Sequence, residues 1–280
     1  MWMGVMIVAM LAQDEPTVPR PRPGRVERTD EDAPAWVLSV RAQMRDFDGW
    51  TRVREWDSEP ATLDLAGDLG LGMLPGGRIT LMRETRLTEW FVEGEIVRGS
   101  GEGVYDVDFA YDEGEFKAGA PFEARAEFFF GRAGVAFKRA FQEGENGWIG
   151  PLVGAEWTRG YLGIFQGGED STENYTQFLP YPIVGLAGEW RASSALTIGL
   201  RAYAGYVPRM PTIFREGGVM HMEVQTASVE VELAWRISAA ARVTLGAGYR
   251  FWYGRLDSAE DDNELSIGGP QVTVGIEIQW

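Results

Sequence analysis

The chain has 280 residues, with 42 acidic and 26 basic side chains, one histidine and no cysteine, which gives a formal net charge of −16. The missing cysteine excludes a disulfide framework, a thiolate metal site and a cysteine nucleophile. The negative charge argues against nucleic-acid binding, which needs a basic stripe. Apolar residues make up 45%, too many for a disordered chain. The length fits one large domain or two small ones.

The first segment has the pattern of a secretion signal. Residues 2–12 are apolar and uncharged, and Gln13, Asp14 and Glu15 follow directly. Such a run, ending on a small residue before a polar turn, is typical of a signal peptide. We expect a signal over residues 1–12, with cleavage after Ala12; the alternative is a short buried helix or strand. Past residue 12 no apolar run approaches the roughly 18 residues of a membrane helix.

Residues 13–35 separate this signal from the rest of the chain. Five prolines alternate here with arginines and acids: Pro16, Pro19, Pro21, Pro23 and Pro34. Proline lacks a backbone donor, and the charges resist burial. We predict a flexible tail, more a spacer than a partner-binding segment, followed by a folded domain over residues 36–280.

From Trp36 onward, apolar and polar residues alternate. Val272, Val274, Ile276 and Ile278 share one face of the last segment, while Thr273, Gly275, Glu277 and Gln279 share the other. The alternating stretches run about 10–15 residues, longer than soluble strands and suited to a tilted strand that crosses a membrane. A membrane barrel turns its apolar face to lipid and its charged face to the lumen. The alternative is a soluble β-sandwich with the apolar face inside.

Strands and connections together predict the topology. We expect ten strands, with eight to twelve possible, over residues 36–47, 76–83, 87–98, 121–139, 147–164, 181–191, 195–206, 223–237, 241–255 and 270–280. Short connections alternate with long ones at 48–75, 99–120, 165–180, 207–222 and 256–269. This pattern indicates an all-β, up-and-down antiparallel transmembrane β-barrel with both termini on the periplasmic, short-turn side. Parity slips near Phe128–Phe130 and predicts a β-bulge at Gly131.

Aromatic side chains lie where strands would cross the two membrane–water boundaries. Aromatic rings favour these boundaries and form belts there. The predicted belt residues are Trp36, Trp157, Trp190, Trp235, Tyr249, Phe251, Tyr253 and Trp280.

The last ten residues, Gln271–Trp280, alternate and end on an aromatic residue. This pattern resembles the C-terminal β-signal of bacterial outer-membrane β-barrel proteins, although a terminal Phe is commoner than Trp. The resemblance implies insertion by the barrel assembly machinery, and residues 36–280 are similar in layout to small outer-membrane barrels. Residues 62–71 also resemble a segment of such proteins that implies no activity.

Charged residues of both signs are expected to face the lumen. They are Arg41, Arg45, Arg78, Glu89, Glu93, Glu95, Glu123, Arg125, Glu127, Glu156, Glu189, Arg191, Arg201, Glu230, Glu232, Arg236, Arg242, Arg250 and Glu277. A charge facing lipid costs about 2–4 kcal/mol at the bilayer midplane, so these residues must point inward. In a narrow lumen we expect them to pair into a stabilising network; a narrow ion path is the alternative.

Catalytic candidates are few. His221 is the only histidine, and Asp106 and Asp108 vaguely resemble the acidic pair of the omptin outer-membrane proteases. Val219 stands where that family has an acid two residues before the histidine, which removes the carboxylate that would orient it. Ser228 lies about two dozen ångströms along the strand from His221, at ~3.4 Å per residue. We therefore expect His221 to be an ordinary rim residue.

The acids of 165–180 and 256–269 lack the spacing of an EF-hand and predict solvated loops. The sequence thus predicts a non-enzymatic outer-membrane protein of structural, adhesive or narrow-channel type, with a salt-bridged lumen and acidic extracellular loops. The alternative is an outer-membrane hydrolase of lipid A or peptides using His221. Expected partners are membrane lipid, lipopolysaccharide and the assembly machinery. No cofactor, metal or nucleic-acid partner is expected.

Overall fold

A computed structural model describes residues 35–54, 61–111, 114–140, 146–167, 169–175, 180–211, 220–258 and 262–280. The signal peptide and almost all of the tail predicted from the sequence fall on residues 1–34, outside the described residues. Within the described ranges no helix is long and apolar enough to cross a membrane.

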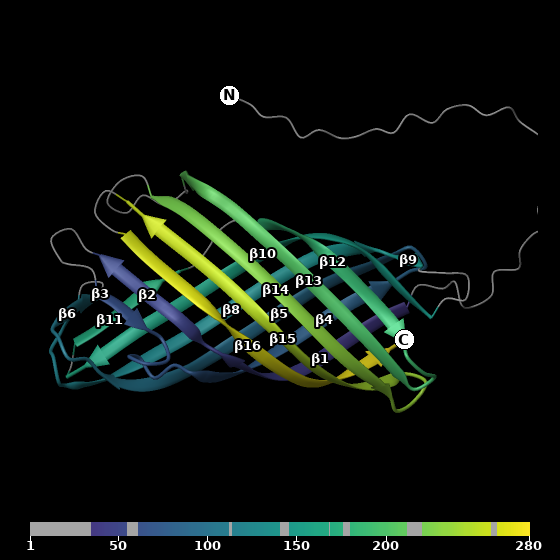
Figure 1. Ribbon diagram of the computed structural model, residues 1–280, viewed down its shortest axis with the longest axis horizontal. Coiled ribbons are helices and arrows are strands. Elements are labelled where there is room, and N and C mark those ends of the chain that lie inside the picture. Colours follow the sequence, from purple (N-terminus) through teal and green to yellow (C-terminus); the bar gives the residue numbers. More distant parts are fainter. Residues whose placement is uncertain are drawn as a thin grey trace, which may run out of the picture. The chain divides into compact units, whose positions relative to one another are not determined.

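Ten long strands form a closed antiparallel ring (Figure 1). Each pairs with its neighbour in the chain, and β1 closes the ring by pairing with β16, Val37 opposite Gln279 and Arg45 opposite Gln271. The ring consists of β1 (Ala35–Asp46), β4 (Met73–Glu84), β5 (Thr88–Val104), β8 (Pro121–Phe137), β10 (Gly147–Gln166), β12 (Tyr181–Arg191), β13 (Leu196–Pro211), β14 (His221–Arg236), β15 (Ala241–Asp257) and β16 (Asp262–Gln279).

The shorter strands extend this ring. β2 (Asp48–Arg54) continues the line of β1 after a break at Phe47 and pairs with the other half of β16, and β3 (Ala61–Asp64) folds back on β2. β6 (Phe109–Tyr111) and β7 (Gly114–Phe116) form a separate hairpin. β9 (Arg139–Ala140) and β11 (Glu169–Asn174) add to the two ends of β10.

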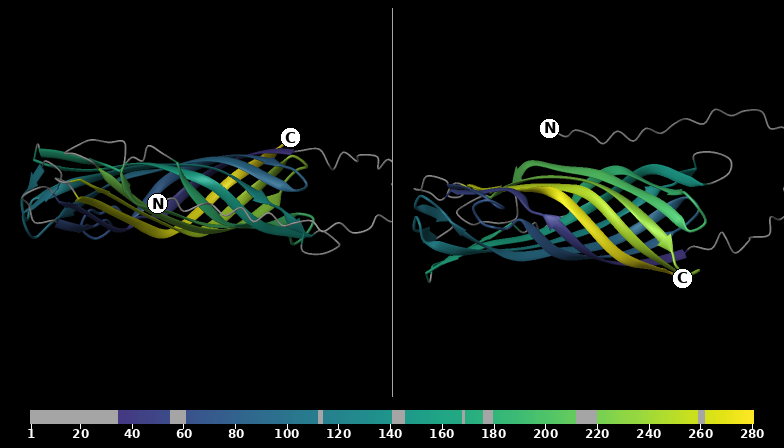
Figure 2. Two further views of the ribbon diagram at one scale, coloured as in Figure 1. Left: turned by 90° about the horizontal axis from the view of Figure 1, so that it is seen from above. Right: turned by 60° about the horizontal axis from the view of Figure 1, so that its bottom comes forward.

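The two rims of the ring differ. The terminal rim carries Ala35, Trp280 and the turns that follow β4, β8, β12 and β14. The loop rim carries β2, β3, β6, β7 and β11, which lie together at the end opposite the C-terminus (Figures 1 and 2). The fold class predicted from the sequence, an antiparallel barrel of about ten strands, is confirmed.

Several local predictions are wrong. No bulge interrupts β8 at Gly131, because its register with β5 and β10 is continuous through that residue. The register instead shifts in β13, between Val207 and Met210. Residues 256–269 are not a long loop: β15 and β16 continue to Asp257 and Asp262, which face each other across the hairpin. Part of 165–180 forms β11.

The polarity of the inner and outer faces of the barrel wall reverses from one rim to the other. Toward the terminal rim the outward side chains are apolar, with Val92 62% and Ile79 57% exposed, and the inward ones include many Arg and Glu residues. Toward the loop rim the inward side chains form a buried apolar core that includes Phe128, Phe130 and Trp252. Crossing a bilayer takes about 9–11 residues of a tilted strand. β10 has 20 residues, so its loop-rim end extends beyond the apolar band.

Candidate functional site: the charged lumen

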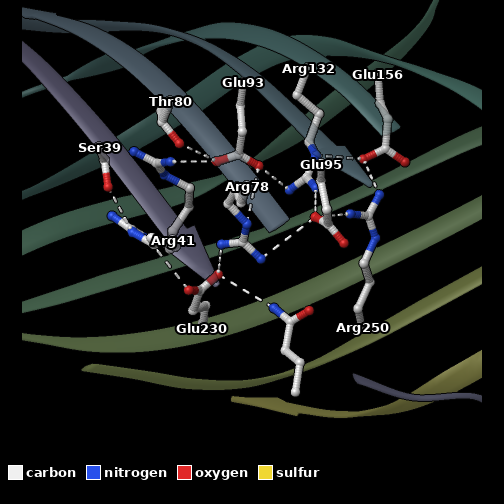
Figure 3. A network of polar contacts seen from close by, with 12 residues as sticks. Ser39, Arg41, Arg78, Thr80, Glu93, Glu95, Arg132, Glu156, Glu230 and Arg250 are labelled. Carbon is white, nitrogen blue, oxygen red and sulfur yellow. Dashed lines mark hydrogen bonds and ion pairs between the residues drawn. The ribbon is translucent and has the colours of Figure 1, made fainter. Parts of the chain in front are cut away.

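The centre of the lumen is a layer of ion pairs around Glu95 of β5 (Figure 3). Its carboxylate is 2.8 Å from Nη1 of Arg250 and 3.5 Å from a guanidinium nitrogen each of Arg45 and Arg78, and it also contacts Arg132. These partners come from β15, β1, β4 and β8, so Glu95 links strands on different sides of the ring.

Glu156 of β10 forms the second acidic centre of this layer. Nη2 of Arg250 lies 2.7 Å and Nε of Arg132 3.3 Å from its Oε2. The Thr226 and Tyr203 hydroxyls donate to the same carboxylate at 3.2 and 3.3 Å, and Tyr181 donates as well. The two carboxylates share Arg132 and Arg250, and every arginine of the layer has at least one carboxylate partner. Arg45 is the least well paired, because its Nε and Nη2 have no hydrogen-bond partner among the described residues.

The layer excludes solvent. Arg45, Glu95, Glu156 and Arg250 are 0% exposed, and Arg132 is 6% exposed. A continuous water path through the lumen at this level would expose some of these groups. On the loop-rim side of the layer, the guanidinium carbons of Arg250 and Arg45 lie 3.9 and 5.2 Å from the Phe130 ring centroid. The arginines therefore join the polar layer to the aromatic core of the loop-rim half.

Toward the terminal rim the network becomes more open. Arg78 Nη1 is 2.5 Å from Glu230. Arg41 Nη1 is 2.6 Å from Glu232, and its Nη2 is 3.1 Å from Glu277. Arg201 of β13 reaches Glu89 of β5, with its Nη2 2.8 Å from the carboxylate. These side chains line a cavity of about 100 Å³ between the sealed layer and the terminal rim.

The structure places most of the predicted lumen residues inside the barrel. The inward ones are Arg41, Arg45, Arg78, Glu89, Glu93, Glu95, Glu156, Glu189, Arg201, Glu230, Glu232, Arg242, Arg250 and Glu277. Arg236 lies at the mouth of the terminal rim and is exposed, although it lines a small pocket with Arg242. Arg191 is exposed at the same rim.

Glu123, Arg125 and Glu127 do not face the lumen, and this prediction is wrong for all three. They lie on the outer face of β8, where Arg125 and Glu127 are exposed and Arg125 pairs with Glu123 at 2.8 Å. The inward residues of this part of β8 are Ala124, Ala126 and Phe128. The outer wall meets water here because this end of β8 lies beyond the apolar band, so charge on the outside carries no lipid penalty.

The sequence reasoning missed Arg132, which bridges both acidic centres. The alternation of β8 could have revealed it, because even-numbered residues face inward without interruption from Phe122 to Ala136. The bulge expected at Gly131 would instead have turned Arg132 outward. The polar groups that complete the network, Thr80 donating to Glu93 at 3.1 Å and Tyr181 to Glu156, were not anticipated either.

The predicted belt residues all lie on the outer face. Near the terminal rim Trp190 is 56% and Trp280 63% exposed, and Trp36 and Trp235 are also exposed. Trp157, Tyr249, Phe251 and Tyr253 lie on the outer faces of β10 and β15, nearer the loop rim.

His221 begins β14 at the loop rim, and its register partner is Asp257 of β15. A carboxylate thus faces the histidine from the next strand, which reasoning along one strand missed. Arg209 holds Asp257 through a bidentate pair, with Nε at 3.0 Å. Ser228 is buried along the cavity of the terminal half, far from His221. Asp108 accepts from the Ala118 amide at 2.8 Å.

Two further acids at the loop-rim end of β16 are paired. Asp262 receives Nε and Nη2 of Arg255 at 2.8 and 2.9 Å, and Glu264 pairs with Arg52. The expectation of solvated acidic loops is therefore wrong for Asp257, Asp262 and Glu264, which belong to strands. Glu260 and Asp261 lie outside the described residues. Among the described residues no group of three His, Asp or Glu side chains is placed to hold a metal ion.

An apolar outer band, aromatic belts and a charged, paired interior define the fold as a transmembrane antiparallel β-barrel. No family model and no curated protein matches the sequence. Among solved structures, the chain is similar to the outer membrane protease OmpT from Escherichia coli, with 12% identity, 87% of this chain and 97% of that chain covered, and a TM-score of 0.45.

Two further similar structures are also outer-membrane proteins. The chain is 9% identical to an outer membrane channel from Pseudomonas putida F1, with 91% and 100% of the two chains covered and a TM-score of 0.41. It is 8% identical to OprG from Pseudomonas aeruginosa, with 89% and 97% covered and a TM-score of 0.39. These likenesses concern the architecture and not the activity.

The prediction that the chain is not an enzyme does not stand. The first of these structures is a protease by its own name, while the channel is not named as an enzyme. A barrel of this kind is therefore no argument against catalysis.

Proposed function

We propose that this chain is an integral protein of the bacterial outer membrane whose barrel is sealed across its lumen. Its terminal rim faces the periplasm, and its loop-rim half extends from the membrane as a rigid, aromatic-filled wall for contacts at the cell surface. The observation that carries this proposal is the buried layer formed by Arg45, Glu95, Arg132, Glu156 and Arg250, because it blocks the lumen at the level where a channel would need water.

The surroundings follow from the outer wall. Acyl chains pack on the apolar band. Lipopolysaccharide surrounds the wall at the height where the outward side chains become charged. The last strand, β16, presents Val272, Val274, Ile276 and Ile278 outward. This face and Trp280 are what the barrel assembly machinery would read.

Surface labelling tests location and orientation together. The chain has no cysteine, so a single introduced thiol is the only one present. Asp106→Cys places it in an exposed connection of the loop rim, and the matched Ser194→Cys in an exposed turn of the terminal rim. A maleimide too large to cross the outer membrane should label D106C on intact cells, and S194C only after permeabilisation. Labelling of S194C on intact cells would contradict the proposal.

The loop rim supports a second candidate, a surface hydrolase. The supporting observation is the register pair of His221 and Asp257, which places a carboxylate of the neighbouring strand beside the histidine. A His–carboxylate pair is a general base when the carboxylate orients the imidazole.

The test compares cells that express the wild type, His221→Ala and the matched Asp257→Asn, with surface peptide cleavage and the lipid A profile as readouts. A hydrolase predicts a product that the wild type makes and both variants lose. Identical profiles in all three strains would remove this candidate.

A further inference from the structure

The terminal rim carries a set of exposed arginines that the lumen network does not use. At least one of them lies at each of the turns after β4, β8, β12 and β14. They are Arg83, Arg86, Arg139, Arg191 and Arg236, and we call them the basic rim. The guanidinium groups of the basic rim make no ion pair with another described residue.

The balance of charge at this rim is unusual for so acidic a chain. The acids at the strand ends beside these turns, Glu84, Glu89 and Glu189, line the lumen cavity instead. Lys138 pairs with Glu84 at 3.8 Å and Arg201 with Glu89 at 2.8 Å. Glu143 and Glu145 fall in the same connection as Arg139 but outside the described residues. A protein with a net charge of −16 thus gathers, on one edge, exposed arginines without an ion-pair partner among the described residues.

The tryptophans of the terminal belt place this edge at a membrane surface. Arg83 faces Trp36 on β1 and Trp90 on β5 across the sheet, and its guanidinium carbon lies 5.7 Å from the Trp36 ring centroid. Arg191 follows Trp190 directly, and Arg236 follows Trp235. Because exposed tryptophan rings favour the headgroup level of a bilayer, the arginines beside them lie at the height of the lipid phosphates.

From this arrangement we propose that the basic rim binds the phosphate groups of anionic glycerophospholipids in the leaflet that surrounds the terminal end. Arginine donates paired N–H groups in a geometry that matches phosphate oxygens, and a low-dielectric boundary strengthens the pairing. Lipids held in this way would fix the depth of the barrel in the membrane. The inference rests on the proposed function, since it requires a barrel that spans a bilayer.

The test uses the full chain reconstituted into phosphatidylcholine vesicles with spin-labelled phosphatidylglycerol or spin-labelled phosphatidylcholine as probe. The ratio of the two probes held at the protein surface measures lipid selectivity. The attraction of one arginine to an anionic surface suffices for a roughly fivefold local preference. Averaged over all lipid sites, we expect the wild type to prefer phosphatidylglycerol by about twofold, and this preference to fall in high salt.

The rim variant replaces Arg83, Arg86, Arg139 and Arg191 by Gln. The control variant removes the same charge from exposed arginines of the loop-rim half: Arg54→Gln, Arg98→Gln, Arg125→Gln and Arg159→Gln. We expect the rim variant to lose the preference, and the control, together with a rim variant carrying Lys at the same positions, to keep it. Heat-modifiable electrophoretic mobility shows that each variant is folded.

Three results would overturn the inference. They are a wild type without preference, a rim variant that keeps it, and a control that loses it equally, since the last would assign the effect to net charge. Failure of the wild type to insert into any bilayer is a different result, because it would overturn the proposed function itself. A barrel that inserts but does not select leaves that function standing and removes only the lipid site.

Discussion

At the scale of single residues, the lumen depends on carboxylates that each serve several arginines. Glu95 has ion pairs to four guanidinium groups, and all five side chains are buried. A buried ion pair gains little over an apolar pair of the same shape, but removing one partner leaves the others uncompensated. Stability in this layer is therefore concentrated in its shared acids.

Replacing Glu95 by Gln should lower the free energy of unfolding by about 3–5 kcal/mol, because four buried arginines lose a common counter-charge. Glu102→Gln on the same strand is the control: Glu102 is exposed, and its loss should cost less than about 0.5 kcal/mol. Urea unfolding of both variants in the same lipid micelles measures the difference. Equal urea midpoints for E95Q and E102Q would show that the ion pairs of Glu95 do not stabilise the barrel.

Asp257 lies at the loop-rim end of β15, beyond the apolar band. Burial by itself would raise the pKa of its carboxyl, but the hydrogen bond and charge of Arg209, together with the charges of Arg255 and His221, hold the pKa below its usual range. A depressed folded-state pKa means that the pair stabilises the fold above the unfolded-state pKa and that this contribution is lost as the pH falls through the folded-state pKa.

Arg209→Gln should therefore raise the pKa of Asp257, and carbon NMR of the labelled carboxyl in micelles follows the change directly. Since Arg209 is 55% exposed, the matching loss of stability stays under about 1 kcal/mol. Arg54→Gln, at an equally exposed arginine that approaches Asp262, serves as the control. A pKa of Asp257 that does not move in R209Q would assign its depression to another cause.

At the scale of elements, the break between β1 and β2 lets two consecutive strands pair with β16, β1 along one half and β2 along the other. Gly49 has a φ of 145°, and a Cβ at this position would lie 2.0 Å from the Ser266 carbonyl oxygen. Such a conformation is strained for any residue with a side chain, and the close backbone leaves no space for one.

Gly49→Ala should cost at least about 1–3 kcal/mol of unfolding free energy. Gly72 is the matched control, because a Cβ there would meet nothing within 4 Å and its φ is ordinary. G72A should leave the urea midpoint almost unchanged. If G49A is as stable as G72A, the glycine is not required to join β1 to β2.

Strand positions could be predicted from the sequence because each strand alternates for ten residues or more. The inward side could be predicted only where the outside meets lipid, since there the charged face must turn inward. In β8 the same rule failed at Arg125 and Glu127, which lie beyond the bilayer, where a charge outside and a phenylalanine inside is the favourable arrangement. The pairing of Asp257 with His221 depends on a register between strands that no single segment contains.

At the scale of the whole barrel, one continuous sheet has opposite polarity in its two halves. The terminal half is apolar outside and ionic inside, and the loop-rim half is polar outside with a core of phenylalanine, leucine and tyrosine. The layer around Glu95 and Glu156 is where the two meet, with arginines stacked on Phe130 at the boundary. In the proposed function, the ionic layer and the apolar core on its loop-rim side close the lumen in series.

Conductance across a planar bilayer tests this closure most directly. The full chain, folded and inserted from detergent, should give no stable current steps at 1 M salt, while a general porin inserted in the same way gives them. Recovery of the heat-modifiable band from the same membranes shows that the silent protein is inserted. Reproducible, ohmic steps from the wild-type chain would contradict a sealed lumen and show a water path through the layer of Arg45, Glu95, Arg132, Glu156 and Arg250.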